Sequence, residues 1–126
     1  MKTSKQVVEA FWSAMATNDF VAASGWLSED YRCIWPQSSE IVEGRANFAA
    51  LNTNYPASGL WRFNVTRILE NGAEVVTEVH ITDGTLAATA ITFHTVTDGL
   101  IKDQVEYWPE PYDAPEWRAK WVKTAG

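Results

Sequence analysis

The chain has little positive charge, one cysteine and no long hydrophobic run. Its 126 residues hold ten lysines and arginines against sixteen acidic residues, which gives a net charge of −6. Because no basic stretch is present to meet phosphates, we expect no nucleic acid partner. Cys33 stands alone, so the sequence provides neither a disulfide framework nor a cysteine-based metal cluster.

Other absences narrow the class of protein further. The first four residues carry no apolar signal core, and no segment approaches the length that spans a membrane. A glycine-rich phosphate loop is also missing, and we expect no cofactor. We therefore predict a soluble, cytoplasmic protein with no membrane partner. It should form one domain over residues 1–126, with its core at about 5–110 and a tail at 111–126.

Helical signals dominate the first part of the chain. Thr3 and Gln6 fit a capping box, and an apolar stripe at helical spacing follows them. Asn18 can end this helix in the left-handed region, while Asp19 can cap a second helix over 20–27. The sequence further predicts a strand at 31–35, a polar loop at 37–43 and a third helix that begins near Gly44.

Strand signals follow, and two Asp-Gly pairs define their order. Strands are predicted at about 61–70, 73–82, 85–97 and 100–108, with turns at Asp83-Gly84 and Asp98-Gly99. Asp-Gly between β-prone residues favours a two-residue hairpin turn, because such a turn needs positive φ at its centre. Helices followed by antiparallel strands indicate the α+β class. We expect a curved sheet wrapped around the helices as a cone with one open mouth.

Two-residue turns would divide the side chains of these strands between two faces. The first face mixes polar and aromatic residues and is interpreted as a ligand pocket: Val76, Glu78, His80, Ala87, Thr89, Ile91, Phe93, Gln104, Glu106 and Trp108. The second face is smooth and apolar and is interpreted as a dimer interface: Thr77, Val79, Ile81, Leu86, Ala88, Ala90, Thr92, Val105 and Tyr107.

The order of these elements resembles the nuclear transport factor 2-like superfamily, and within it the SnoaL-like proteins. The features that carry the resemblance are the Asn18-Asp19 break between helices, a strand ending at Trp35-Pro36, a helix start at Glu43-Gly44-Arg45 and a last strand with Gly99-x-Ile101 that ends in Tyr107-Trp108. The resemblance covers about residues 5–110 and implies the cone-shaped fold. It does not name an activity, since one fold hosts many functions.

Known enzymes of this superfamily give a sharper test. Ketosteroid isomerases use a tyrosine and two aspartates, and matching the Pro36 and Gly99 landmarks puts Phe11, Trp35 and Ile91 at those positions. Limonene epoxide hydrolases use an Asp-Arg-Asp set, whereas the predicted pocket face here has no arginine. Neither set of groups is present. Polyketide cyclases of the SnoaL type instead rely on an inner acid/base carboxylate, and this resemblance draws attention to Glu106.

Glu106, His80 and Glu78 are the candidate catalytic residues. A carboxyl among aromatic and aliphatic side chains has its pKa raised toward a useful range for proton transfer. Glu106 is assigned as the acid/base, His80 as its partner or a hydrogen-bond donor, and Glu78 as an orienting group. The alternative is that the carboxylates are structural groups. His94 is placed on the other face, beside Asp103, as an ion-pairing residue.

The aromatic residues suggest the rest of the pocket. Seven tryptophans in one small domain must fill the core or line a cavity. The candidate ligand-binding residues are Trp12, Trp26, Trp35, Tyr55, Thr89, Ile91, Phe93, Gln104 and Trp108. Three hypotheses follow: an isomerase, cyclase or hydrolase that needs no cofactor; a non-catalytic protein that binds a small, partly apolar organic molecule; or a protein-interaction module. In each case we expect a homodimer.

Overall fold

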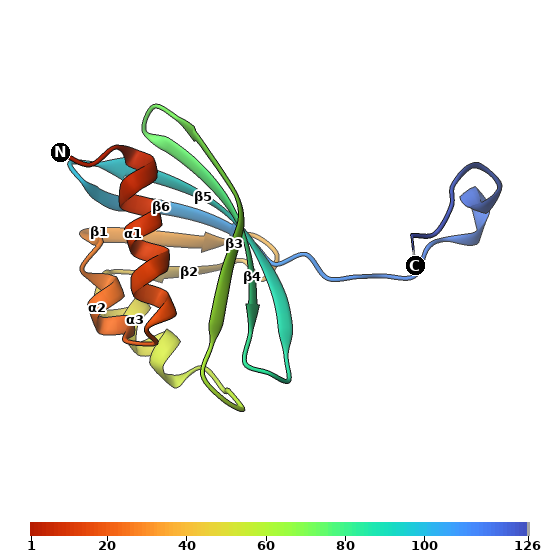
Figure 1. Ribbon diagram of the computed structural model, residues 1–126, viewed down its shortest axis with the longest axis horizontal. Coiled ribbons are helices and arrows are strands. Elements are labelled where there is room, and N and C mark those ends of the chain that lie inside the picture. The colour runs from red at the N-terminus through yellow and green to blue at the C-terminus, as the bar shows by residue number, and fades with distance from the viewer. Residues whose placement is uncertain (126) are drawn as a thin grey trace.

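A curved six-stranded sheet carries three helices on one of its faces (Figure 1). The computed structural model describes residues 1–125. Its elements are α1 (Ser4–Ala16), α2 (Phe20–Ser24), β1 (Leu27–Trp35), β2 (Glu40–Glu43), α3 (Arg45–Asn54), β3 (Arg62–Asn71), β4 (Glu74–Thr82), β5 (Ala87–Thr97), β6 (Leu100–Tyr107) and a 3-10 helix at Glu116–Trp121. The strand order is β2-β1-β6-β5-β4-β3, in which β1 pairs with β6 in parallel. The predicted α+β class and the sheet around N-terminal helices are confirmed.

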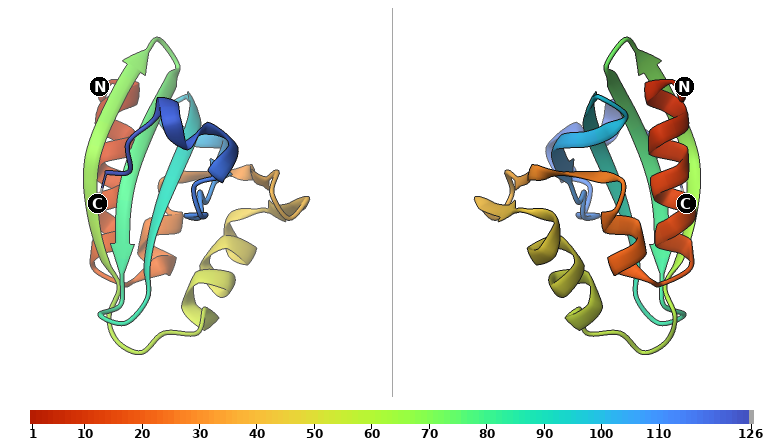
Figure 2. Two further views of the ribbon diagram at one scale, coloured as in Figure 1. Left: turned by 90° about the vertical axis from the view of Figure 1, so that its right-hand side faces the viewer. Right: turned by 90° about the vertical axis from the view of Figure 1, so that its left-hand side faces the viewer.

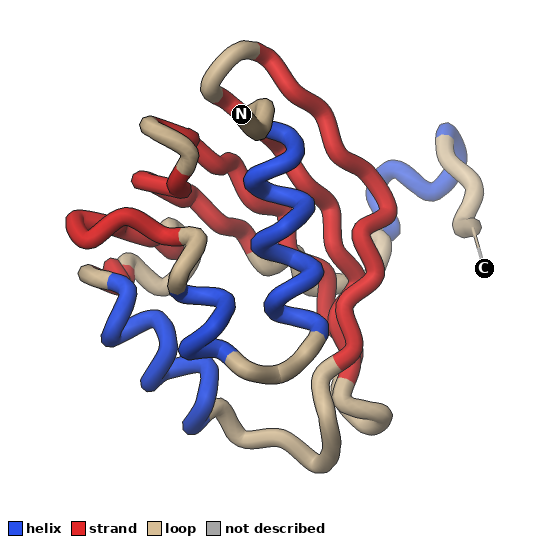
Figure 3. Tube along the Cα trace, turned by 60° about the vertical axis from the view of Figure 1, so that its left-hand side comes forward, coloured by secondary structure: helices blue, strands red, loops and turns tan. Residues whose placement is uncertain are grey.

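The helix boundaries follow from the local sequence. Thr3 and Gln6 form the predicted capping box at the start of α1. Asn18 has a φ of 64°, and Asp19 caps α2 by accepting a hydrogen bond from the Ala22 amide. The apolar stripe of α1 faces the concave side of the sheet, where α2 and α3 lie beside it (Figure 3). β2 was missed because its residues are mostly exposed and read as a polar loop.

The two hairpin turns differ from one another. Asp98 and Gly99 form the predicted two-residue turn, with φ values of 53° and 77°. At the other site, Thr82 pairs with Ala87, so four residues form the connection. The Asp83 carboxylate explains this longer loop, because it accepts hydrogen bonds from the amides of Thr85 and Leu86. Since the register moves by two residues, β4 and β5 keep their predicted faces relative to each other.

A bulge in β6 changes the assignment of faces. Val96 pairs with Ile101, whereas Thr95 pairs with Asp103, which leaves Lys102 as an extra residue. One extra residue turns every later side chain of that strand to the opposite face. Glu106 therefore lies opposite Thr92 rather than Ile91. The predicted pocket face is wrong in this respect: its β4 and β5 residues and its β6 residues belong to different faces.

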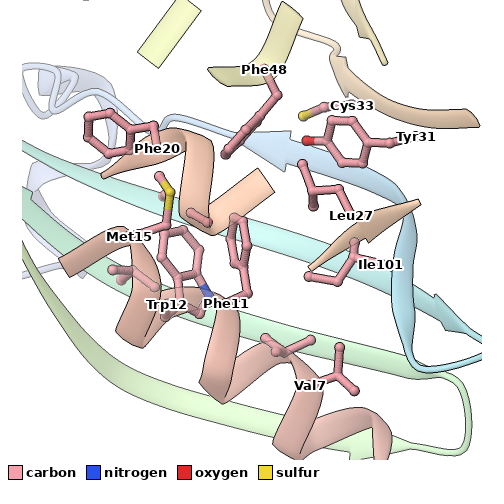
Figure 4. Close-up of a cluster of buried hydrophobic side chains, with 14 of the residues drawn as sticks. Val7, Phe11, Trp12, Met15, Phe20, Leu27, Tyr31, Cys33, Phe48 and Ile101 are labelled. Carbon is pink, nitrogen blue, oxygen red and sulfur yellow. The ribbon is translucent and has the colours of Figure 1, made fainter. Parts of the chain in front are cut away.

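The concave face holds the core. Thr77, Val79, Ala90 and Thr92 are buried there beneath the helices, together with Val75. The assignment of the first four to a dimer interface is therefore wrong. Figure 4 shows how rings from α1 and α3 meet side chains of β1 and β6 in this core. Ala90 lay at the centre of the predicted dimer interface, where a charged substitution would be the natural test. Because Ala90 is buried in the core, such a substitution would disrupt the fold and would not test an interface.

The convex face carries an unbroken row of six apolar residues across the sheet. Cα pairing links Leu69, Val76, Phe93, Val105, Ile34 and Ile41, one from each strand. We call these six residues the outer row. Four of them are 36–68% exposed. A neighbouring pair, Ile91 and Tyr107, widens the apolar surface on one side.

The C-terminal tail extends away from the sheet (Figure 1 and Figure 2). Trp117 and Trp121 in its 3-10 helix are 74% and 69% exposed, so they bury little surface against the domain. The tail does not cover the outer row. Over residues 1–125, no helix combines the length and the apolar character needed to cross a membrane.

Candidate functional site

The concave side of the sheet and the helices enclose a pocket of about 100 Å³. Ten of its twenty lining residues are aromatic, contributed by the helices, the strands, the loop before β3 and the segment after β6. Tyr55 and Leu86 lie at its mouth, where each is about half exposed. The lining residues are Phe11, Trp12, Met15, Phe20, Tyr31, Cys33, Trp35, Val42, Phe48, Leu51, Asn52, Tyr55, Trp61, Phe63, Ile81, Leu86, Ala88, Gln104, Glu106 and Trp108.

Glu106 is the charged residue of this lining. The residue is 8% exposed, and each of its carboxyl oxygens accepts one hydrogen bond. The Trp35 indole N–H donates to Oε1 at 3.0 Å, and the Thr92 hydroxyl donates to Oε2 at 2.6 Å. Burial raises the pKa of Glu106, while these two hydrogen bonds offset part of the rise. The carboxyl is thus fixed in position and holds a proton more readily than an exposed glutamate.

Two further ionisable groups of β1 lie in the same wall. Tyr31 and Cys33 project from the side of β1 that faces the Phe48 ring (Figure 4). Burial raises the pKa of Tyr31 well above its usual value, and it raises the pKa of Cys33 to about 12. The nearby Glu106 charge adds to both shifts. Both groups therefore stay protonated at neutral pH, and the Cys33 thiol is not poised as a nucleophile.

His94 anchors a buried polar chain behind the pocket. Its Nε2 lies 2.8 Å from the Thr77 hydroxyl, and its Nδ1 lies 3.0 Å from the Gln104 amide nitrogen. The Trp12 indole donates to the same Thr77 hydroxyl, and the Tyr31 hydroxyl donates to the Gln104 carbonyl oxygen. A neutral imidazole satisfies both neighbours when Nδ1 accepts from Gln104 and Nε2 donates to Thr77. Burial lowers the pKa of His94 to about 3, so the ring stays neutral.

The structure brings several of the predicted residues together. Glu106 lies in the pocket wall with five of the predicted ligand-binding residues: Trp12, Trp35, Tyr55, Gln104 and Trp108. The other four do not line it. Trp26 packs against the core from outside the pocket. Thr89 pairs with the exposed His80, while Ile91 and Phe93 share the convex face with Tyr107 and the outer row.

Glu78 and His80 lie on the convex face, so their predicted place beside Glu106 is wrong. The Glu78 carboxylate accepts a hydrogen bond from Thr66 at 2.7 Å and lies 3.6 Å from the Arg67 side chain. His80 is exposed. The β6 bulge is the cause, because it separates the face of Glu106 from the face of Glu78. The ion pair predicted for His94 with Asp103 is wrong for the same reason, since His94 is fully buried.

Sequence reasoning missed the residues that support Glu106. Thr92 was placed on the opposite face because the bulge at Lys102 was not recognised. Tyr31, Cys33 and Trp35 alternate along β1, and this spacing could have indicated that β1 also directs side chains into the pocket. Over residues 1–125, no group of three histidine, cysteine, aspartate or glutamate side chains is arranged to hold a metal ion.

A family model for the SnoaL-like domain matches residues 8–104. The chain belongs to the SnoaL-like domain family. No curated protein matches it. Among solved structures, this SnoaL-like protein is similar to a candidate ketosteroid isomerase from Kribbella flavida, with 29% identity, a TM-score of 0.88 and coverage of 98% of this chain and 90% of the other.

Two further structures show the breadth of the likeness. A protein of unknown function from Burkholderia xenovorans, like nuclear transport factor 2, is 31% identical, with a TM-score of 0.78 and coverage of 98% and 95%. An epoxide hydrolase of the LEH-like type from M. tuberculosis is 24% identical, with a TM-score of 0.69 and coverage of 84% and 82%. Proteins of different activity thus share this fold, so the activity must be argued from the pocket.

The structure locates the three residues that the sequence comparison matched to the catalytic residues of ketosteroid isomerases. Phe11 and Trp35 line it, whereas Ile91 lies on the convex face. The neighbouring inward residues of β5 are Ala90 and Thr92, and neither is ionisable. The positions matched to ketosteroid isomerases therefore carry no tyrosine or aspartate, and neither do the inward neighbours of Ile91 on β5. Over the described residues, the pocket lining also contains no arginine.

Proposed function

We propose that this SnoaL-like protein binds a small, partly apolar organic molecule in its aromatic pocket and transfers a proton through Glu106, without a cofactor. The observation that carries the proposal is a buried carboxyl, oriented by Trp35 and Thr92, in a wall that is mostly apolar and aromatic. Such a group suits isomerisation, cyclisation or hydrolysis, in which a proton moves to or from the substrate.

Electrostatics support Glu106 as the proton-transferring group. Its pKa is raised in the direction of neutral pH, whereas Tyr31 and Cys33 hold their protons and His94 stays neutral. A general acid/base is most effective when its pKa lies near the working pH. Glu106 therefore replaces the predicted set of three catalytic residues, and Glu78 and His80 have no part in the proposal.

Replacement of Glu106 tests this function directly. Purified protein would be incubated with pooled small-molecule extracts, and conversion would be followed by mass spectrometry. We expect the Glu106→Gln variant to convert the responding compound at least about 10²-fold more slowly, because the amide keeps the shape but transfers no proton. Glu78→Gln is the matched control, since it removes a carboxylate outside the pocket and should leave the rate unchanged.

The same experiment separates the two other hypotheses. If a compound is retained in the pocket but not converted by the wild-type protein, the chain is a non-catalytic binding protein. If Glu106→Gln converts the compound as fast as wild type, Glu106 is not the acid/base. A protein that retains no compound would favour the interaction module.

We expect no isomerisation of a 3-oxo-Δ5-steroid. The likeness to a candidate ketosteroid isomerase does not supply the missing groups, because Phe11, Ala90 and Thr92 offer no carboxyl or phenol there. A cavity of about 100 Å³ is also small beside the roughly 300–1,000 Å³ of pockets that enclose drug-sized ligands. Absorbance at the wavelength of the conjugated product measures this reaction, and turnover well above the buffer rate would contradict the assignment.

We also propose that the protein is a homodimer formed through its convex face. The outer row supports this, because a monomer rarely exposes a continuous apolar patch of more than a few hundred Å². A second copy related by a two-fold axis would cover the row with itself. Charges of both signs border it, among them Arg32 and Arg67 with Asp103 and Glu78, so paired copies can place opposite charges together.

A further inference from the structure

The pocket joins an aromatic wall to a single negative charge. Among the described residues that line it, Glu106 is the one carboxylate, and no lysine, arginine or histidine accompanies it. Four tryptophans, four phenylalanines and two tyrosines provide half of the lining. Aromatic rings attract cations through their quadrupoles, and the attraction is stronger where water is excluded.

Glu106 also has unused hydrogen-bonding capacity. A carboxylate offers about four lone-pair positions, and here Trp35 and Thr92 fill two of them. Over residues 1–125, its carboxylate takes part in no salt bridge. A buried carboxylate is stabilised when a cation pairs with it. The pocket lining supplies no such cation, so the ionised form of Glu106 can gain this stabilisation from a cationic ligand.

The size and charge of the site restrict what that partner can be. An apolar cavity of roughly 150 Å³ takes up benzene, so a pocket of about 100 Å³ suits a molecule of about that size or smaller. An anion would meet the charge of Glu106 without a cationic side chain to balance it. A hydrated metal ion would meet mostly apolar rings rather than the oxygen ligands that it needs.

We infer that the pocket binds a small alkylated amine in its protonated form, whose N–H donates to Glu106 and whose alkyl groups lie against the aromatic wall. The inference rests on the proposed function because it uses the same pocket, and it names the charge class of the ligand. The carboxylate that pairs with the cation is the group proposed to exchange the proton.

The pH dependence of binding follows from the groups around Glu106. Tyr31 and Cys33 face it from β1, and His94 lies on β5 beside Thr92. The pKa of Tyr31 is raised well above its usual value, the pKa of Cys33 is raised to about 12, and the pKa of His94 is lowered to about 3. Tyr55, which is half exposed, lies at the mouth. Because a cation favours the ionised carboxyl, amine binding should strengthen as the pH rises through the raised pKa of Glu106, and binding should release the Glu106 proton.

Four water-soluble probes of similar size test the charge class. They are 2-(dimethylamino)ethanol as the protonated tertiary amine, choline as the quaternary cation, 3,3-dimethylbutan-1-ol as the neutral isostere of choline, and 3,3-dimethylbutanoate as the anion. Titration calorimetry at pH 7.5 measures each affinity. We expect the tertiary amine to bind at least about ten-fold more tightly than the neutral alcohol, and the anion to give no heat of binding.

Two variants assign the preference to the carboxylate. Glu106→Gln should reduce the advantage of the amine over the alcohol to within about two-fold. Glu78→Gln should leave that advantage unchanged, because its carboxylate lies on the convex face. If Glu106→Gln does not fold, the wild-type pH profile decides: amine binding must rise with pH and release a proton, while alcohol binding must not change.

Several results would overturn the inference. Equal or tighter binding of the neutral alcohol would remove the charge preference while leaving the proposed acid/base function intact. Tighter binding of choline than of the tertiary amine would show that an N–H donor is not required. Binding of the anion, or of no probe at millimolar concentration, would refute the cation site. By contrast, failure of the proposed function appears as unchanged conversion by Glu106→Gln.

Discussion

Lowering the pH from 7 to 4 is expected to cost the folded protein about 3 kcal/mol through His94 alone. The ring has a folded-state pKa of about 3 against an ordinary value of 6.5, because burial disfavours the imidazolium. A depressed folded-state pKa means that the stabilisation is fully present above about pH 6.5 and is lost as the pH falls toward about 3. The polar chain explains the cost, since Gln104 already donates to the nitrogen that would take the proton.

Glu106 acts in the opposite direction. Its folded-state pKa is raised above 4.5, so its protonated form favours folding at low pH and its ionisation opposes folding as the pH rises through the shifted value. This partly flattens the acid side of the stability profile. The shift of the His94 pKa from 6.5 to about 3 nevertheless covers the whole range from pH 6 to pH 4.

The comparison of variants isolates this effect. Free energies of unfolding would be measured with urea at several pH values for wild type, His94→Gln and His80→Gln. The glutamine at position 94 can still accept a hydrogen bond from Gln104 and donate one to Thr77, and it does not titrate. The free energy of unfolding of this variant should therefore fall by about 3 kcal/mol less than that of wild type between pH 7 and pH 4. His80→Gln changes the other, exposed histidine and should keep the wild-type slope. Equal slopes for wild type and His94→Gln would contradict the prediction.

Much of the fold could be read from local signals. Thr3 with Gln6, Asn18 with Asp19 and the Asp98-Gly99 turn each act within a few residues, and each has its predicted role. The order of helices and strands then identified the fold, because few arrangements place three helices in the first half of the chain and a four-stranded meander after them. Helix ends and tight turns could thus be predicted wherever the deciding interaction or backbone conformation involves residues only a few positions apart.

The site was less predictable because it depends on register over a distance. A single extra residue, Lys102, reverses the faces of β6, and nothing in its side chain marks the bulge. The side chains of Glu106 and Glu78 therefore appear on one face in the sequence but lie on opposite faces of the sheet. The placement of Glu106 in the pocket agrees with the prediction, but the register used to derive it does not hold. His94 and Thr92 were lost for the same reason.

Replacing Phe93 with arginine is expected to separate the proposed dimer into monomers. Phe93 occupies a central strand in the outer row, is 43% exposed and lies 6.2 Å from the Tyr107 ring, measured between centroids. An unpaired guanidinium buried at the centre of an apolar interface would weaken association by at least about 10²-fold. The domain itself should stay folded, because the Phe93 side chain contributes to the convex face and not to the concave core.

Light scattering coupled to size exclusion measures this outcome at micromolar concentration. Wild type should run at twice the chain mass of 14.1 kDa, and Phe93→Arg should run at 14.1 kDa. Leu60→Arg is the matched control, because this apolar residue is 77% exposed in the loop before β3, outside the outer row, and should leave the dimer intact. A wild-type monomer would refute the dimer. A dimer that survives Phe93→Arg would place the interface elsewhere, and the exposed tail with Trp117 and Trp121 would then be the surface to test.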